Sequence, residues 1–334
     1  MLTMALTAAL FTGCSSKLAD TTPPTIDAAS AAASPPVTAT PAGVVRPLPG
    51  PAQAATFDAG TGSLVVLGGR ADEGSVLTVF SATGSAAATR LEGTATALAG
   101  DDEGRLFLST KGGYFRFDIA SGTATRIGVQ GLDQVDITAI ARRTDGRLVL
   151  GSADGAVYTL ASDTTVGARL KIFARVDSIV MQGDTAVVLD RGQTSITSLN
   201  SEGTKAEQAL RAGEGATTMA ADSAGLVLVT DTRGGELLVY GVDPLILRQR
   251  FPVPDSPYGL AASGTRTGLA WVAQTATNTV VGYDLATGIP VEKVRYQTVQ
   301  QPNSLAFDNA SATLYVVSGA GAGVQVITSA GVPK

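Results

Sequence analysis

The sequence predicts an all-β fold, a seven-bladed β-propeller of four-stranded blades. The 334 residues include 39 glycines, with Val, Thr and Ala in short runs, a composition that favours short strands over long helices. Residues 216–255 show one complete unit of four short strands separated by turn residues. Its second strand recurs at spacings of 42, 42, 38, 40, 43 and 45 residues, which is the period of a propeller blade. The seven recurring strands begin at Leu64, Leu106, Leu148, Ala186, Leu226, Leu269 and Leu314.

Composition excludes several classes of site. The chain contains no histidine, which removes Ser-His-Asp triads, histidine general bases and histidine-ligated metals. Its one cysteine, Cys14, allows neither an intrachain disulfide nor a cysteine metal cluster. The formal net charge is −5 and Lys and Arg are dispersed, so nucleic acid is disfavoured as a partner. We therefore expect no cofactor, no resident metal and no nucleic-acid partner.

The N-terminus has the character of an export signal. Residues 1–13 are apolar, end in small residues and are too short to span a bilayer as a helix. The following Leu10–Ser16 segment, LFTGCSS, resembles a bacterial lipobox, in which the cysteine after a small residue is lipidated. Two acyl chains on Cys14 would anchor the protein stably, at about 0.8 kcal/mol per buried CH₂. The alternative is an incidental or buried cysteine behind a degenerate signal.

Residues 14–43 are expected to be the lipidated cysteine followed by a disordered tether. Ala, Ser, Thr and Pro dominate residues 15–43, and no apolar periodicity is present. Such a segment buries too little surface to offset its ordering entropy. It therefore predicts a spacer that holds the domain off the membrane, on the outer face of the plasma membrane of an exporting cell.

Residues 44–334 are expected to form the propeller, closed by its own N-terminal strand. The last unit ends soon after its third strand, GVQVIT, so it lacks a fourth strand. Val44–Pro49 precedes the first inner strand and fills the same place as LRQRFPV before Tyr258. We expect this segment to be the outer strand of the last blade, which hides two sheet edges. A β-sandwich is the alternative, but seven units of near-constant length favour the ring.

The later units resemble a known repeat family. Residues 216–328 contain Leu228-Val229-Thr230-Asp231, Leu238-Val239-Tyr240 and Pro257-Tyr258-Gly259, which resemble the YVTN repeat of YncE-like seven-bladed propellers. The whole chain, with Cys14, a Pro-rich tether and a propeller, resembles the actinobacterial LppL-type lipoproteins. That resemblance implies a location in the cell envelope and a fold, and it implies no particular catalytic activity.

Polar residues open each inner strand and predict the lining of the central channel. One interpretation is a hydrogen-bonding ring for a small polar ligand. The other, which we favour, is ordinary channel lining that is satisfied by water. The seven residues are Gln53, Thr96, Thr138, Asp177, Thr217, Tyr258 and Asn303.

Sugar-lactone hydrolases offer an enzymatic comparison, because many propellers of this family hold a cation on channel carboxylates and amides. Hard cations require clustered oxygen ligands, and this ring offers only Asp177 with Asn303 and Gln53. Arg142, Arg143 and Arg147 form the densest basic spot. We expect it to be a solvated rim, with docking of an anionic group as the alternative.

We therefore predict a lipid-anchored propeller that is not an enzyme, acting as a scaffold or binding module for an envelope protein or a wall component. The alternatives are a metal-assisted hydrolase using Asp177 and Asn303, and a small-ligand receptor that depends on Thr138 and Thr217. Trp271, in the middle of the LAWVA segment, is expected to pack between blades.

Overall fold

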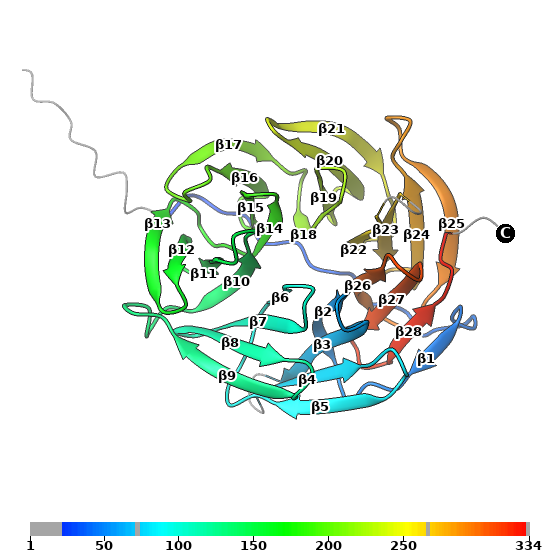
Figure 1. The fold of residues 1–334 in the computed structure, drawn as a ribbon. Helices are drawn as coiled ribbons and strands as arrows, with labels where there is room; N and C mark the ends of the chain where they lie inside the picture. The colour runs from blue at the N-terminus through cyan, green and yellow to red at the C-terminus, as the bar shows by residue number, and fades with distance from the viewer. Residues whose placement is uncertain (1–21, 71–73, 265–267, 332–334) are drawn as a thin grey trace, which may run out of the picture.

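The structure, a computed structural model, describes residues 22–70, 74–264 and 268–331. Over these ranges every regular element is a β-strand, and the strands form seven four-stranded antiparallel sheets arranged as a ring (Figure 1). The predicted seven-bladed propeller is confirmed. No helix among the described residues is long and apolar enough to cross a bilayer. The predicted signal peptide and Cys14 lie outside the described residues.

We number the blades in chain order, and within each blade the strands run from the centre to the rim. Blade 1 holds β2 (Ala52–Asp58), β3 (Ser63–Arg70), β4 (Gly74–Phe80) and β5 (Ala86–Arg90). Blade 2 holds β6 (Leu98–Gly100), β7 (Arg105–Thr110), β8 (Gly113–Asp118) and β9 (Thr123–Gly128). Blade 3 holds β10 (Ile137–Arg142), β11 (Leu148–Ser152), β12 (Ala156–Ser162) and β13 (Thr165–Lys171).

The remaining blades repeat this plan. Blade 4 holds β14 (Ser178–Gln182), β15 (Thr185–Asp190), β16 (Ser195–Leu199) and β17 (Ala206–Arg211). Blade 5 holds β18 (Ala216–Ala221), β19 (Leu226–Asp231), β20 (Glu236–Val242) and β21 (Leu245–Pro252). Blade 6 holds β22 (Pro257–Ala262), β23 (Leu269–Gln274), β24 (Thr279–Asp284) and β25 (Val291–Gln297). Blade 7 holds β26 (Pro302–Asp308), β27 (Thr313–Ser318), β28 (Val324–Ile327) and β1 (Val44–Arg46).

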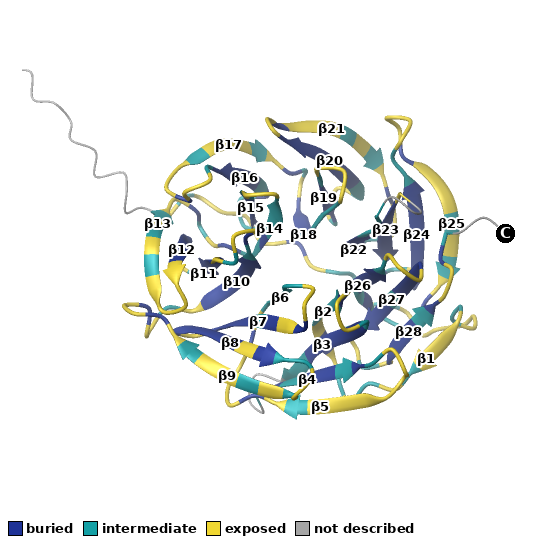
Figure 2. Ribbon diagram, viewed as in Figure 1, coloured by how far each residue is buried: buried dark blue, intermediate teal, exposed yellow. Residues whose placement is uncertain are grey.

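The hydrophobic pattern of each strand follows its depth in the blade. The second strands contain the predicted apolar segments and are buried on both faces, because each blade packs between two others; β19 and β23 are examples. The outer strands alternate instead, since one face meets solvent, and β13 and β25 appear mostly exposed in Figure 2.

The ring is closed as the sequence predicts. β1 pairs antiparallel with β28, with Val45 opposite Gln325, so blade 7 joins the two ends of the chain. Blade 7 then packs on blade 1 through a shared apolar cluster that includes Leu64, Val66, Val317 and Val324. Because β1 pairs with β28, closure covers the outer edge of β28, and the cluster shared with blade 1 completes the ring of inter-blade contacts.

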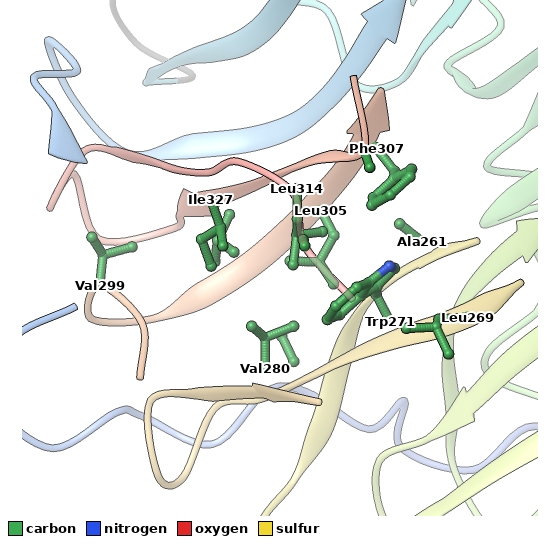
Figure 3. Close-up of a cluster of buried hydrophobic side chains, with 13 residues drawn as sticks. Ala261, Leu269, Trp271, Val280, Val299, Leu305, Phe307, Leu314 and Ile327 are labelled. Atoms are coloured by element: carbon green, nitrogen blue, oxygen red, sulfur yellow. The ribbon is translucent and has the colours of Figure 1, made fainter. Parts of the chain in front are cut away.

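The largest buried side chain, Trp271, packs between blades 6 and 7 (Figure 3). Its side chain is 0% exposed and its ring stacks on Tyr296 and Phe307, with both ring centroids 6.1 Å away. Phe307 comes from blade 7, so the expected inter-blade role of Trp271 is confirmed. Its indole Nε1 is buried and has no hydrogen-bond partner among the described residues.

We predict that Trp271→Ala lowers the free energy of unfolding by about 3–5 kcal/mol, because it opens a large cavity between two blades. Trp271→Phe should cost much less, since it keeps a stacked ring and removes a buried unpaired N–H that costs about 1–3 kcal/mol. Urea unfolding followed by far-UV circular dichroism measures both, with the exposed Val291→Ala in the neighbouring outer strand as control. Equal losses for the two Trp271 variants would contradict this account.

Candidate functional site

The N-terminal segment lies across one face of the ring. Residues 22–43, which we call the strap, contain no helix or strand and cross the middle of the ring before entering β1 (Figure 1, blue). The face they cover, the strap face, carries the loops before each inner strand and the turns between second and third strands. Residues 22–43 therefore differ from the expected free spacer. Main-chain hydrogen bonds hold them, and such bonds need no apolar side chains.

The first part of the strap binds blades 4 and 5. The Ile26 N–H donates to the Gly192 carbonyl at 2.8 Å, in the turn between β15 and β16. The guanidinium of Arg233 donates to the Asp27 carbonyl at 2.6 Å, and that of Arg191 donates to the Ala29 carbonyl. All these hydrogen bonds are made to main-chain groups of the strap.

The second part binds blades 6 and 7, and Gln301 is its centre. The Gln301 side chain accepts from the Ser34 N–H at 2.9 Å and donates to the Ala32 carbonyl at 3.0 Å. The Ser34 hydroxyl donates to the Thr275 carbonyl at 2.5 Å and accepts from the Gln301 N–H at 3.1 Å. Asn278 then donates to the Pro35 carbonyl at 2.8 Å. One glutamine thus fixes the direction and register of the strap.

Shape complementarity is strongest at Ala29. Its side chain is buried, with 7% exposure, against Gly215 in blade 5. A Cβ added at Gly215 would lie 2.7 Å from the Ala29 methyl, and one added at Gly192 would lie 3.1 Å from Thr25. The close approach of the strap therefore requires glycine at position 215 and leaves little room for a side chain at position 192.

The strap face also holds non-glycine residues in the left-handed region. Ser256 and Gln301 have φ of 59° and 55°, and they occupy the same position, two residues before Tyr258 and Asn303. Asn278 has φ of 50°. Such conformations cost about 1–3 kcal/mol each and cluster at functional sites. All three residues contact the strap, since Ser256 also accepts from the Ala32 N–H at 3.0 Å.

Threonines of the predicted channel ring bond to the next blade. The Thr96 hydroxyl donates to the Ile137 carbonyl at 2.8 Å, and the Thr138 hydroxyl donates to the Val176 carbonyl at 2.5 Å. In both cases the acceptor directly precedes the ring residue of the following blade. These hydroxyls connect inner strands of neighbouring blades and are already occupied.

Blade 5 makes the same connection with a cluster of hydroxyls. Thr217 is buried and lies 2.5 Å from the Thr232 hydroxyl, which donates to the Pro257 carbonyl of blade 6 at 2.6 Å. A β-bulge lies at Thr138, at Thr217 and at the matching position of the other bulged inner strands. Bulges re-aim a side chain, which explains why these threonines point along the ring.

The other ring residues are spread over the ring. Asp177, half-buried in blade 4, accepts from the Arg175 Nε at 3.0 Å and from the Arg191 N–H at 2.8 Å. Asn303, in blade 7, accepts from the Gln301 amide at 2.9 Å. Gln53 is exposed and Tyr258 is half-buried. Asp177 and Asn303 lie on non-adjacent blades, and the described residues contain no group of three acidic or thiol side chains that could hold a metal.

Two buried aspartates that sequence reasoning missed shape the strap face. Asp231 is 0% exposed and accepts from the N–H groups of Glu214, Gly215 and Gly234 at 2.7–2.9 Å. Asp190 occupies the same place in blade 4, at the end of the second strand. Each ties the preceding loop to the turn of its own blade. The Thr-Asp and Leu-Asp endings of these strands are the sequence signal that could have indicated them.

The basic spot divides into two environments. Arg143 is buried and donates to the Asp184 carbonyl at 3.2 Å, so it is not the solvated rim that the sequence suggested. Arg142 and Arg147 line a cleft of about 260 Å³ between blades 2 and 3, on the face opposite the strap. Arg147 and Asp145 form an ion pair there at 2.7 Å. The cleft also contains Arg105, Arg116, Asp101 and Asp163, so opposite charges are interspersed within it.

Comparisons with known proteins identify the fold and no family. No protein-family model and no curated protein matches the chain. A streptogramin B lyase is similar in structure, with TM-score 0.69 and 11% identity over 86% of this chain and 97% of that one. A virginiamycin B lyase from Staphylococcus aureus has a TM-score of 0.67 and 11% identity, over 83% of this chain and 94% of that one. A chain of a mitotic checkpoint complex has a TM-score of 0.71 and 12% identity, over 90% of this chain and 98% of that one. At these identities the similarity establishes a seven-bladed propeller.

We predict that Thr138→Val lowers the free energy of unfolding by about 1–3 kcal/mol, because it leaves the buried Val176 carbonyl without its donor. Thr138→Ser keeps the hydroxyl and should retain most of the stability. Chemical unfolding of the two variants separates this structural role from ligand contact. Full stability in Thr138→Val would show that the hydroxyl is free for a ligand.

We predict that Asp145 titrates well below a normal aspartate. The hydrogen bond from Arg147 lowers the pKa of Asp145 from 3.8 to about 2. Because the folded pKa is depressed, the carboxylate stabilises the fold above its unfolded pKa, and that contribution is lost as the pH falls towards 2. Carboxyl NMR titration of the wild type and of Arg147→Gln measures this, and the variant should titrate nearer 3.8. An unchanged pKa in the variant would contradict the assignment.

Proposed function

We propose that this protein is a non-enzymatic binding module of the cell envelope, anchored by a lipid on Cys14 at the outer face of the plasma membrane. Its partner is an envelope protein that it engages on the strap face. One observation carries the binding role: the strap face already holds an extended protein segment through contacts to its main chain.

The strap supports a defined orientation at the membrane. If Cys14 carries the anchor, only residues 15–21 separate it from the strap, and a fully extended chain of that length reaches at most about 30 Å. The strap face would then lie towards the bilayer, and the arginine cleft would face away from it. A membrane-associated partner fits this arrangement better than a distant wall polymer.

The arrangement of the ring residues also favours binding over catalysis. Thr96 and Thr138 bond to neighbouring blades, and both carboxylate oxygens of Asp177 accept hydrogen bonds from arginine residues. The chain has no histidine to act as a general base. The lyase neighbours share the fold at 11% identity, which does not transfer their activity to this chain.

The anchor is tested first. We predict that Cys14→Ser moves the protein from the membrane fraction to the soluble fraction of cells that export it, because the acyl chains are lost. Metabolic labelling with a clickable fatty acid should mark the wild type alone. Membrane retention and labelling of the variant would exclude this anchor.

The working face is tested by a matched pair of photo-crosslinking residues in blade 2. Lys111 is exposed in the turn on the strap face, and Glu103 is exposed in the turn on the opposite face. We predict that a photo-crosslinker at Lys111 captures an envelope protein in native membranes, while one at Glu103 does not. Capture from Glu103 alone would place the partner on the opposite face.

A further inference from the structure

We propose that the strap face is a peptide-binding groove whose built-in occupant is residues 26–35. An extended segment of a partner protein exchanges with this occupant. The proposal extends the binding role argued above by naming the chemistry of the partner, and it does not depend on the lipid anchor.

The groove recognises main chain and makes few demands on side chains. Arg191, Arg233, Asn278 and Gln301 donate to carbonyls of the strap, and Ser256 accepts from one of its N–H groups. These groups come from four successive blades, so they form one continuous track. A track of this kind holds an extended chain in a fixed direction, as β-augmentation sites do, with small pockets that add specificity.

Only two side chains of the occupant are tightly specified. Ala29 is buried and its methyl group packs against Gly215, so we expect a larger side chain at this position to disturb the contact. Ser34 makes two hydrogen bonds through its hydroxyl. Pro35 follows, and its ring restricts Ser34 to an extended conformation. Most other side chains from residue 26 to residue 35 are exposed or half-buried.

These contacts define the partner. It is an extended, weakly charged segment with a small residue, four unrestricted residues, then Ser-Pro. The left-handed conformations of Ser256 and Gln301 support a site that is preformed for such a segment. A disordered Ala/Ser/Pro-rich stretch of an envelope protein has the required chemistry.

The test uses the full-length chain in detergent. The double variant Ala29→Glu/Ser34→Ala loosens the strap and leaves the groove intact, because both changes lie in the occupant. The probe is a fluorescein-labelled peptide of residues 24–37, and binding is measured by fluorescence anisotropy. We expect the loosened variant to bind at least about tenfold tighter than the wild type, because the tethered strap competes at millimolar effective concentration.

Matched controls isolate the groove. Ala28 is exposed beside Ala29, so Ala28→Glu should leave the strap in place and behave as wild type. Gln301→Gly, added to the loosened variant, should reduce peptide binding about tenfold, the effect of losing roughly 1.4 kcal/mol. Glycine adopts positive φ readily, so the loop should keep its shape, and circular dichroism checks folding.

Two further peptides test the partner chemistry. One keeps only Ala29, Ser34 and Pro35 of the strap sequence and should bind the loosened variant, and the other replaces these three and should not. Failure of the loosened variant to bind the strap peptide would show that the strap is a permanent part of the fold. Binding that ignores Gln301→Gly would place the peptide elsewhere. Both results overturn the groove and leave the anchor test unaffected.

Discussion

The pairing of β1 with β28 constrains the rest of the molecule. Because the outer strand of blade 7 comes from the N-terminus, residue 44 is fixed at the rim between the last blade and the first. The strap must therefore reach the face of the ring from this point. Ala42 is held there by hydrogen bonds, because its N–H donates to the Gln297 carbonyl and its carbonyl accepts from the Gln325 side chain. Ring closure and strap placement are therefore parts of one arrangement. A change that opens blade 7 would also release the strap.

Threonine side chains at the centre of the ring act between blades. Adjacent blades share apolar cores, but their inner strands also need partners for exposed carbonyls near the channel. Thr96 and Thr138 supply donors across successive gaps, and Thr232 does so in blade 5. At the blades that carry a threonine, the repeated position therefore has a structural role between blades. A polar ring in a repeat protein is not by itself a binding site.

Local sequence patterns predicted what depends on neighbours along the chain. Three features could be predicted from the sequence, since each follows from strand periodicity or from a missing strand. They are the apolar second strands, the closing segment at Val44–Pro49 and the packing of Trp271. The placement of the strap could not be predicted from the sequence, because its contacts join residues far apart in the chain, such as Ser34 and Gln301, which are 267 residues apart. Low hydrophobicity indicated a segment that cannot form a core by itself. It did not indicate that a preformed surface binds its main chain.

The strap face combines features that make a loop surface specific without large apolar pockets. Gly192 and Gly215 let the bound chain approach closely. Asp231 accepts hydrogen bonds from two N–H groups of the loop of Gly215 and a third from Gly234, in the turn that follows β19. Gln301 then sets the register from a left-handed position. A rigid surface loses less conformational entropy on binding a flexible chain than a flexible surface would lose. The same rigidity that holds the strap in place would allow another chain to replace it.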